Sequence, residues 1–376
     1  MRLAEAVGGE GLAEGFLDLA PAIYRDDPYW IPEDSEYLEA CFGHASPWLR
    51  RGPAHTFCVP GRARASVFRP SDLEIDGAPA AFFGHFESAG DERADARVIG
   101  AAREWAHDVG AARLYGPVDL SPALGHCLRL ERAPRSRRYL DEPYNPARYG
   151  DALRALGLRE DRRYAGIDCD ETELRMLAAV GAPVERALLA EGYRLEPLTP
   201  AAWEQRRAEV HTLANAVFAG NFGFIPLTRT EFDAVFDARW ARRLDPRLSV
   251  LAIAPDGRVA GFSPYTPDYV PLMVKGAGAT RVALRDVSFA DHATALSRLG
   301  EPAAVARASG VDPGHQRRGL ITAMSTWSAR RAVEHGLRVF YGRVVMGSPA
   351  LRLFKNVRAT RRSYALFVTD GNGSGR

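Results

Sequence analysis

VDPGHQRRGLITAMSTW (residues 311–327) places a Pro, a Gln, two arginines and a Gly between a strand-like run and a helix-like run. It places two adjacent arginines, Arg317 and Arg318, where an amphipathic helix is predicted to begin. A helix N-terminus already carries a partial positive charge and unpaired backbone N–H groups, so further positive charge there is unfavourable. A bound phosphate or pyrophosphate would resolve the conflict, with Gly319 allowing close backbone approach. A solvated turn whose arginines point into water is the alternative interpretation.

Length and composition limit the possible classes of protein. A chain of 376 residues with 46% hydrophobic content favours two domains with substantial cores. The formal net charge is +2, from 49 basic and 47 acidic residues, which argues against a protein that coats nucleic acid along its whole surface. Any anion site must therefore be local. Lysine occurs only at Lys275 and Lys355, so a single arginine is weak evidence for a site.

The cysteines and the hydrophobic segments bear on metal binding and location. The four cysteines are widely spaced and lack the short spacing of zinc sites and redox pairs: Cys41, Cys58, Cys127 and Cys169. We expect buried thiols in a reducing compartment and no metal. The N-terminus lacks an apolar signal core, and no stretch approaches the length needed to span a bilayer. We therefore expect a cytoplasmic protein without a membrane partner.

Strand-like and helix-like patterns alternate twice in a comparable order, which predicts two α/β units. The predicted division is 1–170 for the first unit, 171–194 for a connecting segment, 195–370 for the second unit and 371–376 for a flexible Gly-rich tail. In the second unit, a hairpin over 248–268 turns at Asp256-Gly257, and a strand over 302–311 leads into the quoted turn. A helix over 320–336 and a strand over 337–345 complete a βαβ unit, whose ligand lies at the carboxyl end of its first strand.

The stretch GVDPGHQRRGLITAM resembles the acyl-CoA motif of the GNAT acyltransferase superfamily. Val311, Pro313, Gln316 and Gly319 fit that motif, whereas Ile321 stands where the family usually has Gly or Ala. Together with stretches such as FLDLAPAIYRDDPYWIP, AAREWAHDVGAARLYGPVDLS and NAVFAGNFGFIPLTRTEF, almost the whole chain is similar to a subgroup with two GNAT-like halves. The resemblance implies two tandem units, each a mixed, strongly twisted β-sheet flanked by helices.

The resemblance also implies a donor site in the second unit, for acetyl-CoA or another acyl-CoA. The backbone amide of Val311 would polarise the thioester carbonyl, and the amides from Arg317 to Thr322 would cradle the pyrophosphate. The donor-binding residues are then Gly310, Val311, Gln316, Arg317, Arg318, Gly319, Leu320, Ile321 and Thr322. The first unit carries Glu87, Asp91 and Glu92 in its matching turn, which would repel a pyrophosphate. We expect that unit to be degenerate, without a donor site.

Catalytic residues are harder to assign. Many GNAT members protonate the leaving thiolate with a Tyr, but the matching stretch GSPALRLFKN has Phe354 there. The candidates that remain are Tyr265, Asp268, Ser309 and Tyr341, each of which also has an ordinary structural interpretation as a buried Tyr, a turn residue or a strand residue. Arg307 alternates with Ser309 along one strand, and Asn221 and Phe222 lie in an aromatic loop. These three are the candidate substrate-binding residues: Asn221, Phe222 and Arg307.

The sequence thus predicts an N-acyltransferase that acts on the amine of a small molecule, with the acceptor bound where the two units meet. Two alternatives stay open. An aminoacyl-tRNA could be the acyl donor, because its ester leaves without the missing Tyr, or the protein could be a non-catalytic acyl-CoA or metabolite sensor. A bulky residue at Gly319 is expected to abolish donor binding and leave the fold intact. The identity of the acceptor and the oligomeric state are not predicted.

Overall fold

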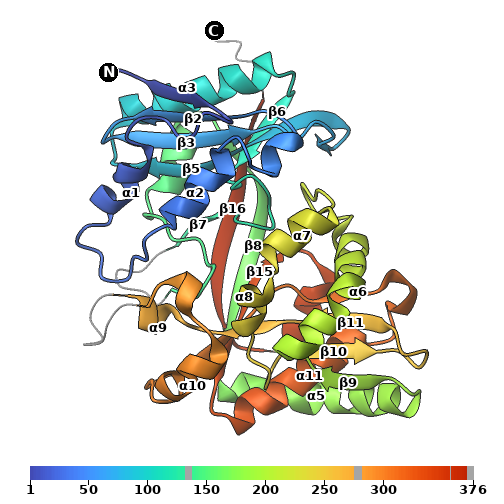
Figure 1. The fold of residues 1–376 in the computed structure, drawn as a ribbon. Helices are drawn as coiled ribbons and strands as arrows, with labels where there is room; N and C mark the ends of the chain where they lie inside the picture. The colour runs from blue at the N-terminus through green and yellow to red at the C-terminus, as the bar shows by residue number, and fades with distance from the viewer. Residues whose placement is uncertain (132–137, 275–281, 356, 371–376) are drawn as a thin grey trace.

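The computed structural model describes residues 1–131, 138–274, 282–355 and 357–370, and its two units pack together in one molecule (Figure 1). The strands of the first half are β1 (Ala4–Val7), β2 (Ala54–Val59), β3 (Ala63–Phe68), β4 (Glu74–Ile75), β5 (Ala78–Ser88), β6 (Arg113–Gly116), β7 (Leu128–Arg129) and β8 (Arg159–Cys169). Its helices are α1 (Phe16–Ile23), α2 (Ser35–Phe42), α3 (Glu92–Asp108) and α4 (Tyr149–Ala155), followed by α5 (Glu171–Ala190) in the predicted connecting segment.

The second half contains β9 (Arg194–Pro197), β10 (Val250–Ile253), β11 (Val259–Ser263), β12 (Tyr265–Pro267), β13 (Ala303–Ala306), β14 (Gly310–Val311), β15 (Arg338–Val345) and β16 (Thr360–Asp370). Its helices are α6 (Pro200–Phe218), α7 (Arg229–Val235), α8 (Ala238–Arg242), α9 (Val270–Met273), α10 (Phe289–Ser297) and α11 (Leu320–Glu334). Short 3-10 helices are η1 (Trp48–Arg50), η2 (Leu284–Asp286), η3 (Pro313–His315) and η4 (Pro349–Phe354). The predicted tail 371–376 lies outside the described residues.

One large mixed sheet runs through both units. Its strand order is β1-β2-β3-β5-β6-β16-β8-β15-β13-β12, with β4 beside β5 and β7 beside β16. Each unit contributes a parallel pair, β5 with β6 and β13 with β15. A second sheet has the order β14-β11-β10-β9. The mixed sheets flanked by helices agree with the predicted fold class.

The two units exchange a strand at the centre of the large sheet. The last strand of the chain, β16, pairs with β6 of the first unit, while β8 pairs with β15 of the second. β16 and β8 also pair with each other along most of their length and lie at the middle of the molecule (Figure 1). Sequence order alone assigns β8 to 1–170 and β16 to 195–370, so each unit's sheet is completed by a strand from the other.

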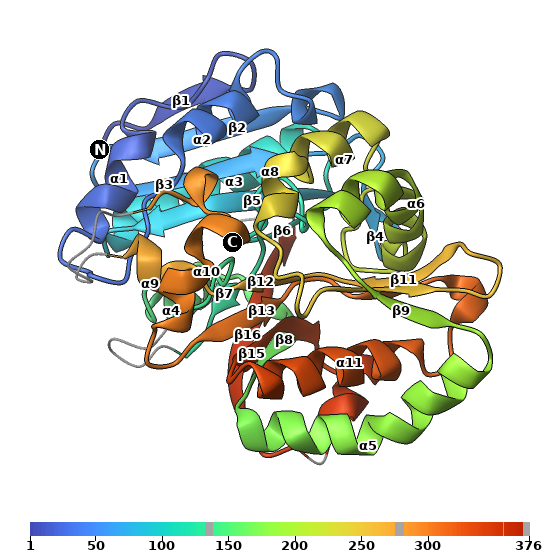
Figure 2. The same ribbon diagram turned by 60° about the horizontal axis from the view of Figure 1, so that its bottom comes forward.

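Local signals in the sequence set the helix boundaries. The carboxylate of Asp170 accepts from the backbone of Thr172 and Glu173, and the Glu173 side chain accepts from the Asp170 N–H, which forms a capping box at the start of α5. Thr199 caps α6, whose first residue is Pro200. In Figure 2, α11 lies between α5 and the strands, so one helix is covered on both sides.

The apolar core crosses the junction between the units. One cluster of buried side chains joins Tyr115 and Val118 of the first unit to Val305 and Phe340 of the second. All four cysteines are buried and free, as the sequence predicts. Within the described residues, no helix combines the length and hydrophobicity needed to cross a bilayer.

Candidate functional site

The two sheets separate at one place in the second unit. β11 belongs to the small sheet, and β12, which follows after Pro264 alone, belongs to the large one. The strand predicted over 302–311 divides in the same way, because β13 pairs with β15 in the large sheet and β14 pairs with β11 in the small one. The last register pair of β13 and β15 is Ala306 with Tyr341. Beyond that pair the two parallel strands part, and we call this place the strand divergence.

The backbone of Val311 faces the open edge of β14. β14 is the outermost strand of its sheet, and the N–H of Asp312 donates to the carbonyl of Ala260 at 2.9 Å. Backbone groups of consecutive residues point to opposite sides of a strand, so the N–H of Val311 points away from β11. That direction is toward the strand divergence. The amide is thus oriented to donate to a carbonyl oxygen placed there.

The turn between β14 and α11 leaves backbone donors free. Arg317 and Gly319 have left-handed φ values of 63° and 92°, and Gly319 is the N-cap of α11. No described side chain caps this helix, and its first turn contains no acidic residue. The first N–H groups of α11 are therefore without intrahelical partners. The Arg318 guanidinium lies 3.7 Å from Glu191, but both side chains are more than half exposed, so the pair is weak.

Packing against α5 also favours a glycine at position 319, which the sequence alone did not indicate. A Cβ atom at this position would lie 2.4 Å from Cγ1 of Val184 on α5. Gly181 of α5 is equally constrained, because its Cβ would lie 1.7 Å from Oγ1 of Thr326 on α11. A bulky residue at Gly319 is therefore expected to cost stability as well as donor binding, since both the φ angle and the α5 contact oppose it.

Three of the four predicted catalytic residues come together beneath the strand divergence. The Oγ atoms of Ser309 and Ser263 are 2.7 Å apart, and the rings of Tyr265 and Tyr341 meet edge to face at 6.5 Å. Burial raises the pKa of both tyrosines, and each lies in the apolar cluster between α11 and the sheet. A buried hydroxyl at neutral pH is thus kept protonated.

The hydroxyl of Tyr341 is an unsatisfied buried group. It makes no well-formed hydrogen bond with the residues that the structure describes, although the residue is buried, and its polar neighbour is the side chain of Tyr265, which helps to raise its pKa. Its ring packs against Phe354 with centroids 4.8 Å apart. An orphaned buried hydroxyl is costly in a folded protein, and such groups call for an explanation such as a catalytic role. Tyr341 therefore stands beside the position where the resemblance implies a proton donor.

The other predicted residues lie elsewhere. Asp268 is fully buried at the end of β12, where its carboxylate accepts from the Val270 N–H at 3.4 Å, so the structure separates it from the tyrosines. Asn221 is exposed in a turn after α6. Phe222 packs edge to face on Tyr115 at 5.2 Å and beneath the guanidinium of Arg162, both from the first half of the chain. Phe222 thus joins the two units.

Arg307 directly follows β13 and forms an ion pair with Asp141 of the first unit. Arg343 of β15 donates to the backbone carbonyl of Asp141 at 2.8 Å. Sequence reasoning missed Asp141, Arg343 and their neighbour His126, whose pKa burial lowers to about 3. Arg343 follows Tyr341 by two residues on a predicted strand, and this spacing could have placed both side chains on the same face of the sheet. No pattern in the sequence indicated that Asp141 would lie beside these arginines.

The corresponding place in the first unit is closed. The carboxylate of Asp91 caps α3 by accepting from the backbone N–H groups of Arg93 and Ala94, both at 3.1 Å. After β6, the N–H of Val118 donates to the carbonyl of Phe83, so the chain itself occupies the space where β5 and β6 part. Among the described residues, no group of three or more His, Cys, Asp or Glu side chains is placed to hold a metal ion.

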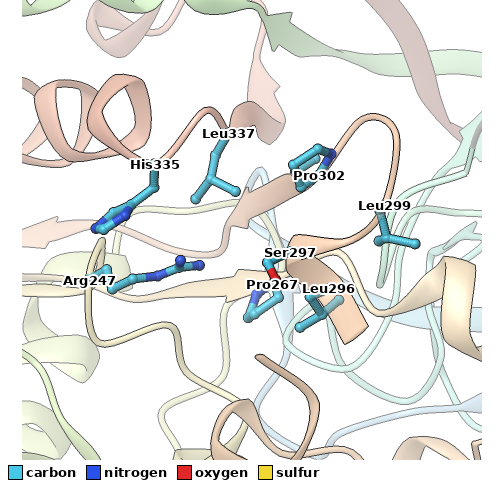
Figure 3. A pocket seen from close by; sticks show the side chains of 9 residues that line it. Arg247, Pro267, Leu296, Ser297, Leu299, Pro302, His335 and Leu337 are labelled. Atoms are coloured by element: carbon cyan, nitrogen blue, oxygen red, sulfur yellow. The ribbon is translucent and has the colours of Figure 1, made fainter. Parts of the chain in front are cut away.

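A small cavity of about 60 Å³ lies at the other end of β13 and β15, away from the strand divergence (Figure 3). Arg247 and His335 lie on one side of it, with Pro302, Leu299 and Leu337 nearby (Figure 3). Nε and Nη2 of Arg247 donate to the two carboxylate oxygens of Asp245, at 2.9 and 2.7 Å. This cavity is too small and too distant from the predicted site residues to belong to the same site.

No family model matches the chain, and no curated protein matches it in sequence. Its fold is similar to that of a tandem GNAT protein from the clavulanic acid biosynthesis pathway, at 14% identity and a TM-score of 0.51 over 100% of this chain and 99% of that one. It is also similar to a conserved protein of unknown function from Enterococcus faecalis V583, described as a probable N-acyltransferase, at 9% identity and a TM-score of 0.54 over 98% of this chain and 73% of that one. The chain therefore has the tandem GNAT fold that its sequence motifs resemble.

Proposed function

We propose that the protein is an N-acyltransferase that moves an acyl group from an acyl-CoA thioester to the amine of a small molecule. The observation that carries this proposal is the open edge of β14 leading directly into the uncapped N-terminus of α11. The open edge of β14 places a backbone N–H donor at the strand divergence, and the N-terminus of α11 offers several N–H donors to an anion. A thioester joined to a pyrophosphate needs both kinds of donor at the two ends of one molecule.

The proposed donor site uses the turn and the first turn of α11. The backbone amides of residues 317–322 bind the pyrophosphate, and the exposed guanidiniums of Arg317 and Arg318 add charge-assisted hydrogen bonds. The weak pair with Glu191 leaves Arg318 available. The N–H of Val311 then donates to the thioester oxygen, where negative charge develops as the amine attacks. This arrangement explains why the sequence places two arginines at a helix N-terminus.

We assign the protonation of the leaving group to Tyr341. When the amine nitrogen bonds to the acyl carbon, the C–S bond breaks, the thiolate takes one proton and the nitrogen loses one. Phe354 has no proton to give, but the Tyr341 hydroxyl beside it is kept protonated by burial, and its polar neighbour is Tyr265. Water can return the proton from the amine side. Tyr265 packs against Tyr341 edge to face, and the Ser309 hydroxyl bonds to that of Ser263.

The proposed acceptor site is the junction of the units, where Arg307 and Arg343 meet Asp141. The first unit, 1–170, contributes residues to this site but binds no donor, because its helix N-terminus is capped by Asp91. The second unit, 195–370, holds the donor. Buried free cysteines support a reducing compartment such as the cytoplasm.

Titration calorimetry with acetyl-CoA and free CoA tests the donor site. We expect micromolar binding by the natural protein and weaker binding by Arg318→Ala. Arg93→Ala is the matched control, because Arg93 is an exposed arginine in the first turn of α3. Release of free thiol in the presence of amines tests transfer. Absence of CoA binding, with salt-sensitive binding of deacylated tRNA instead, would reject the acyl-CoA donor.

A further inference from the structure

Two arginines flank the strand divergence on neighbouring strands. Arg307 is the residue that follows β13, and Arg343 lies on β15, in the register shift between Tyr341 and Val344 against β8. A bulge of this kind turns a side chain away from its regular direction, and bulges are enriched beside functional sites. Both guanidiniums reach Asp141 of the first unit, Arg307 at its carboxylate and Arg343 at its backbone carbonyl.

The charges at this place do not balance. The carboxylate of Asp141 pairs with Arg307, and Arg343 has no carboxylate partner among the residues that the structure describes. The titratable neighbours of Arg343 are His126, Cys127 and Tyr164, and burial keeps each of them uncharged near neutral pH. Two cations therefore share one anion.

The single anion is held in a way that allows its replacement. Asp141 lies in a turn with a left-handed φ of 60°, outside the helices and strands. Its side chain is 36% exposed and that of Arg307 is 25% exposed, so a ligand can reach the pair from solvent. A carboxylate of a ligand could therefore pair with Arg343, which has no carboxylate partner among the described residues. It could also replace Asp141 at Arg307, because that ion pair is partly solvated.

We propose that the acceptor carries a carboxylate in addition to its amine, as an amino acid does, and that Arg307 and Arg343 bind this carboxylate in place of Asp141. The inference rests on the proposed function, because it names the substrate class of the same site. Paired guanidiniums bind carboxylates through parallel, charge-assisted hydrogen bonds, which fix orientation as well as adding affinity. The acceptor's amine is then held close to the strand divergence, where the donor's acyl carbon is expected.

Matched acceptors test this inference. Thiol release from acetyl-CoA is measured with the twenty amino acids and, for each, the primary amide, which keeps the amine and removes the negative charge. The protein is expected to prefer the acid of at least one pair by about 10-fold or more, the range of a charge-assisted contact. Arg343→Gln should raise the KM for that acid by a similar factor and leave the KM for the amide unchanged. Arg285→Gln, an exposed arginine paired with Glu36, is the control.

Asp141→Asn separates binding from a purely structural link between the units. If Asp141 competes with the acceptor, the variant lowers the KM for the acid several-fold. A structural link predicts lower stability with an unchanged KM, and that result would overturn the inference. Equal use of acids and amides, or acetyl-CoA binding without transfer to any acid, would overturn it as well. Failure to bind acetyl-CoA at all would instead reject the proposed function.

Discussion

Helices α3 and α11 each follow a strand and precede its parallel neighbour, yet their N-termini are built for opposite purposes. α3 is capped by Asp91, which also pairs with Arg62, and carries Glu92 and Asp95 in its first turn. α11 has Gly319 as its N-cap and no acid in its first turn. The cap of α3 satisfies two of its free N–H donors, whereas the uncapped α11 leaves its own donors free for water or for an outside anion. One scaffold thus carries a closed and an open version of the same turn.

The strands beside these helices differ in the same way. In the first unit, Val118 bonds to Phe83 and the Asp119 carboxylate accepts from the His85 N–H at 2.7 Å, so the chain fills the space between β5 and β6. A Cβ at Gly84 would lie 2.3 Å from the Val118 carbonyl oxygen. In the second unit, the corresponding region holds the unsatisfied hydroxyl of Tyr341. In the first unit, polar groups of the chain bond to one another and fill the space between the parallel strands. In the second unit, polar groups at the corresponding place lack such partners among the described residues.

The largest effect is expected for Tyr341→Phe. Loss of the proton donor should lower kcat by about 100-fold, a typical contribution of general acid catalysis, with unchanged affinity for acetyl-CoA. Stability should not fall, because the variant removes a buried hydroxyl without a hydrogen bond in the described structure. Steady-state kinetics and urea unfolding check both statements.

Tyr149→Phe in the first unit is the matched control. The Tyr149 hydroxyl donates to Glu87 at 2.6 Å and accepts from the Ser88 N–H at 2.7 Å. Its loss should cost about 1 kcal/mol of stability or more and leave kcat unchanged. If both variants reduced kcat alike, Tyr341 would have no special role.

Gly319→Val is expected to weaken CoA binding by at least 10-fold. The valine Cβ meets Val184, and a β-branched residue is strained at a φ of 92°, so the turn must change shape. The same strain should lower the free energy of unfolding by about 1–3 kcal/mol. Calorimetry and thermal unfolding measure the two effects. Normal CoA affinity in a folded variant would contradict the placement of the donor on this turn.

Arg318→Ala should weaken CoA binding by about 3- to 10-fold, a smaller loss because the side chain is solvent-exposed. The loss should shrink at high salt, because screening weakens an exposed ionic contact. Stability should stay within about 0.5 kcal/mol of the natural protein. An equal loss in Arg93→Ala would show that the effect is general electrostatics and not contact at α11.

Asp91→Ala removes the cap of α3 and should lower stability by about 1 kcal/mol. CoA stoichiometry tells whether the cap alone keeps the first unit from binding a donor. We expect one CoA per chain in both proteins, because the chain also fills the space between β5 and β6. A second binding event in the variant would show that the two units differ only in their caps.

The last prediction concerns stability and not catalysis, through its dependence on pH. Burial raises the pKa of Glu87 from its usual value to about 7, with hydrogen bonds from Tyr149 and Tyr24. The folded state keeps this proton where the unfolded state has lost it, so stability should fall as pH rises from about 4.5 to 7. Glu87→Gln mimics the protonated form and should flatten that fall. Unfolding by urea across this pH range measures it.

Local patterns were sufficient for much of the fold. The hairpin at Asp256-Gly257 appears as β10 and β11, and the helix predicted over 320–336 appears as α11. Turn residues and helix caps act through neighbours in the chain, so sequence carries their signal directly. The turn from Pro313 to Gly319 was recognisable for the same reason, since its chemistry lies in one continuous stretch.

Tertiary structure alone decided how these parts meet. The exchange of β8 and β16 and the division of the strand at 302–311 depend on pairing between residues far apart in the chain. The packing of Val184 on Gly319, the orphaned hydroxyl of Tyr341 and the pairing of Asp141 with Arg307 arise in the same way. The prediction of an anion site at this turn needs the sequence alone, because backbone geometry at a helix N-terminus is local. Which side chains face that site was decided only when distant segments came into contact.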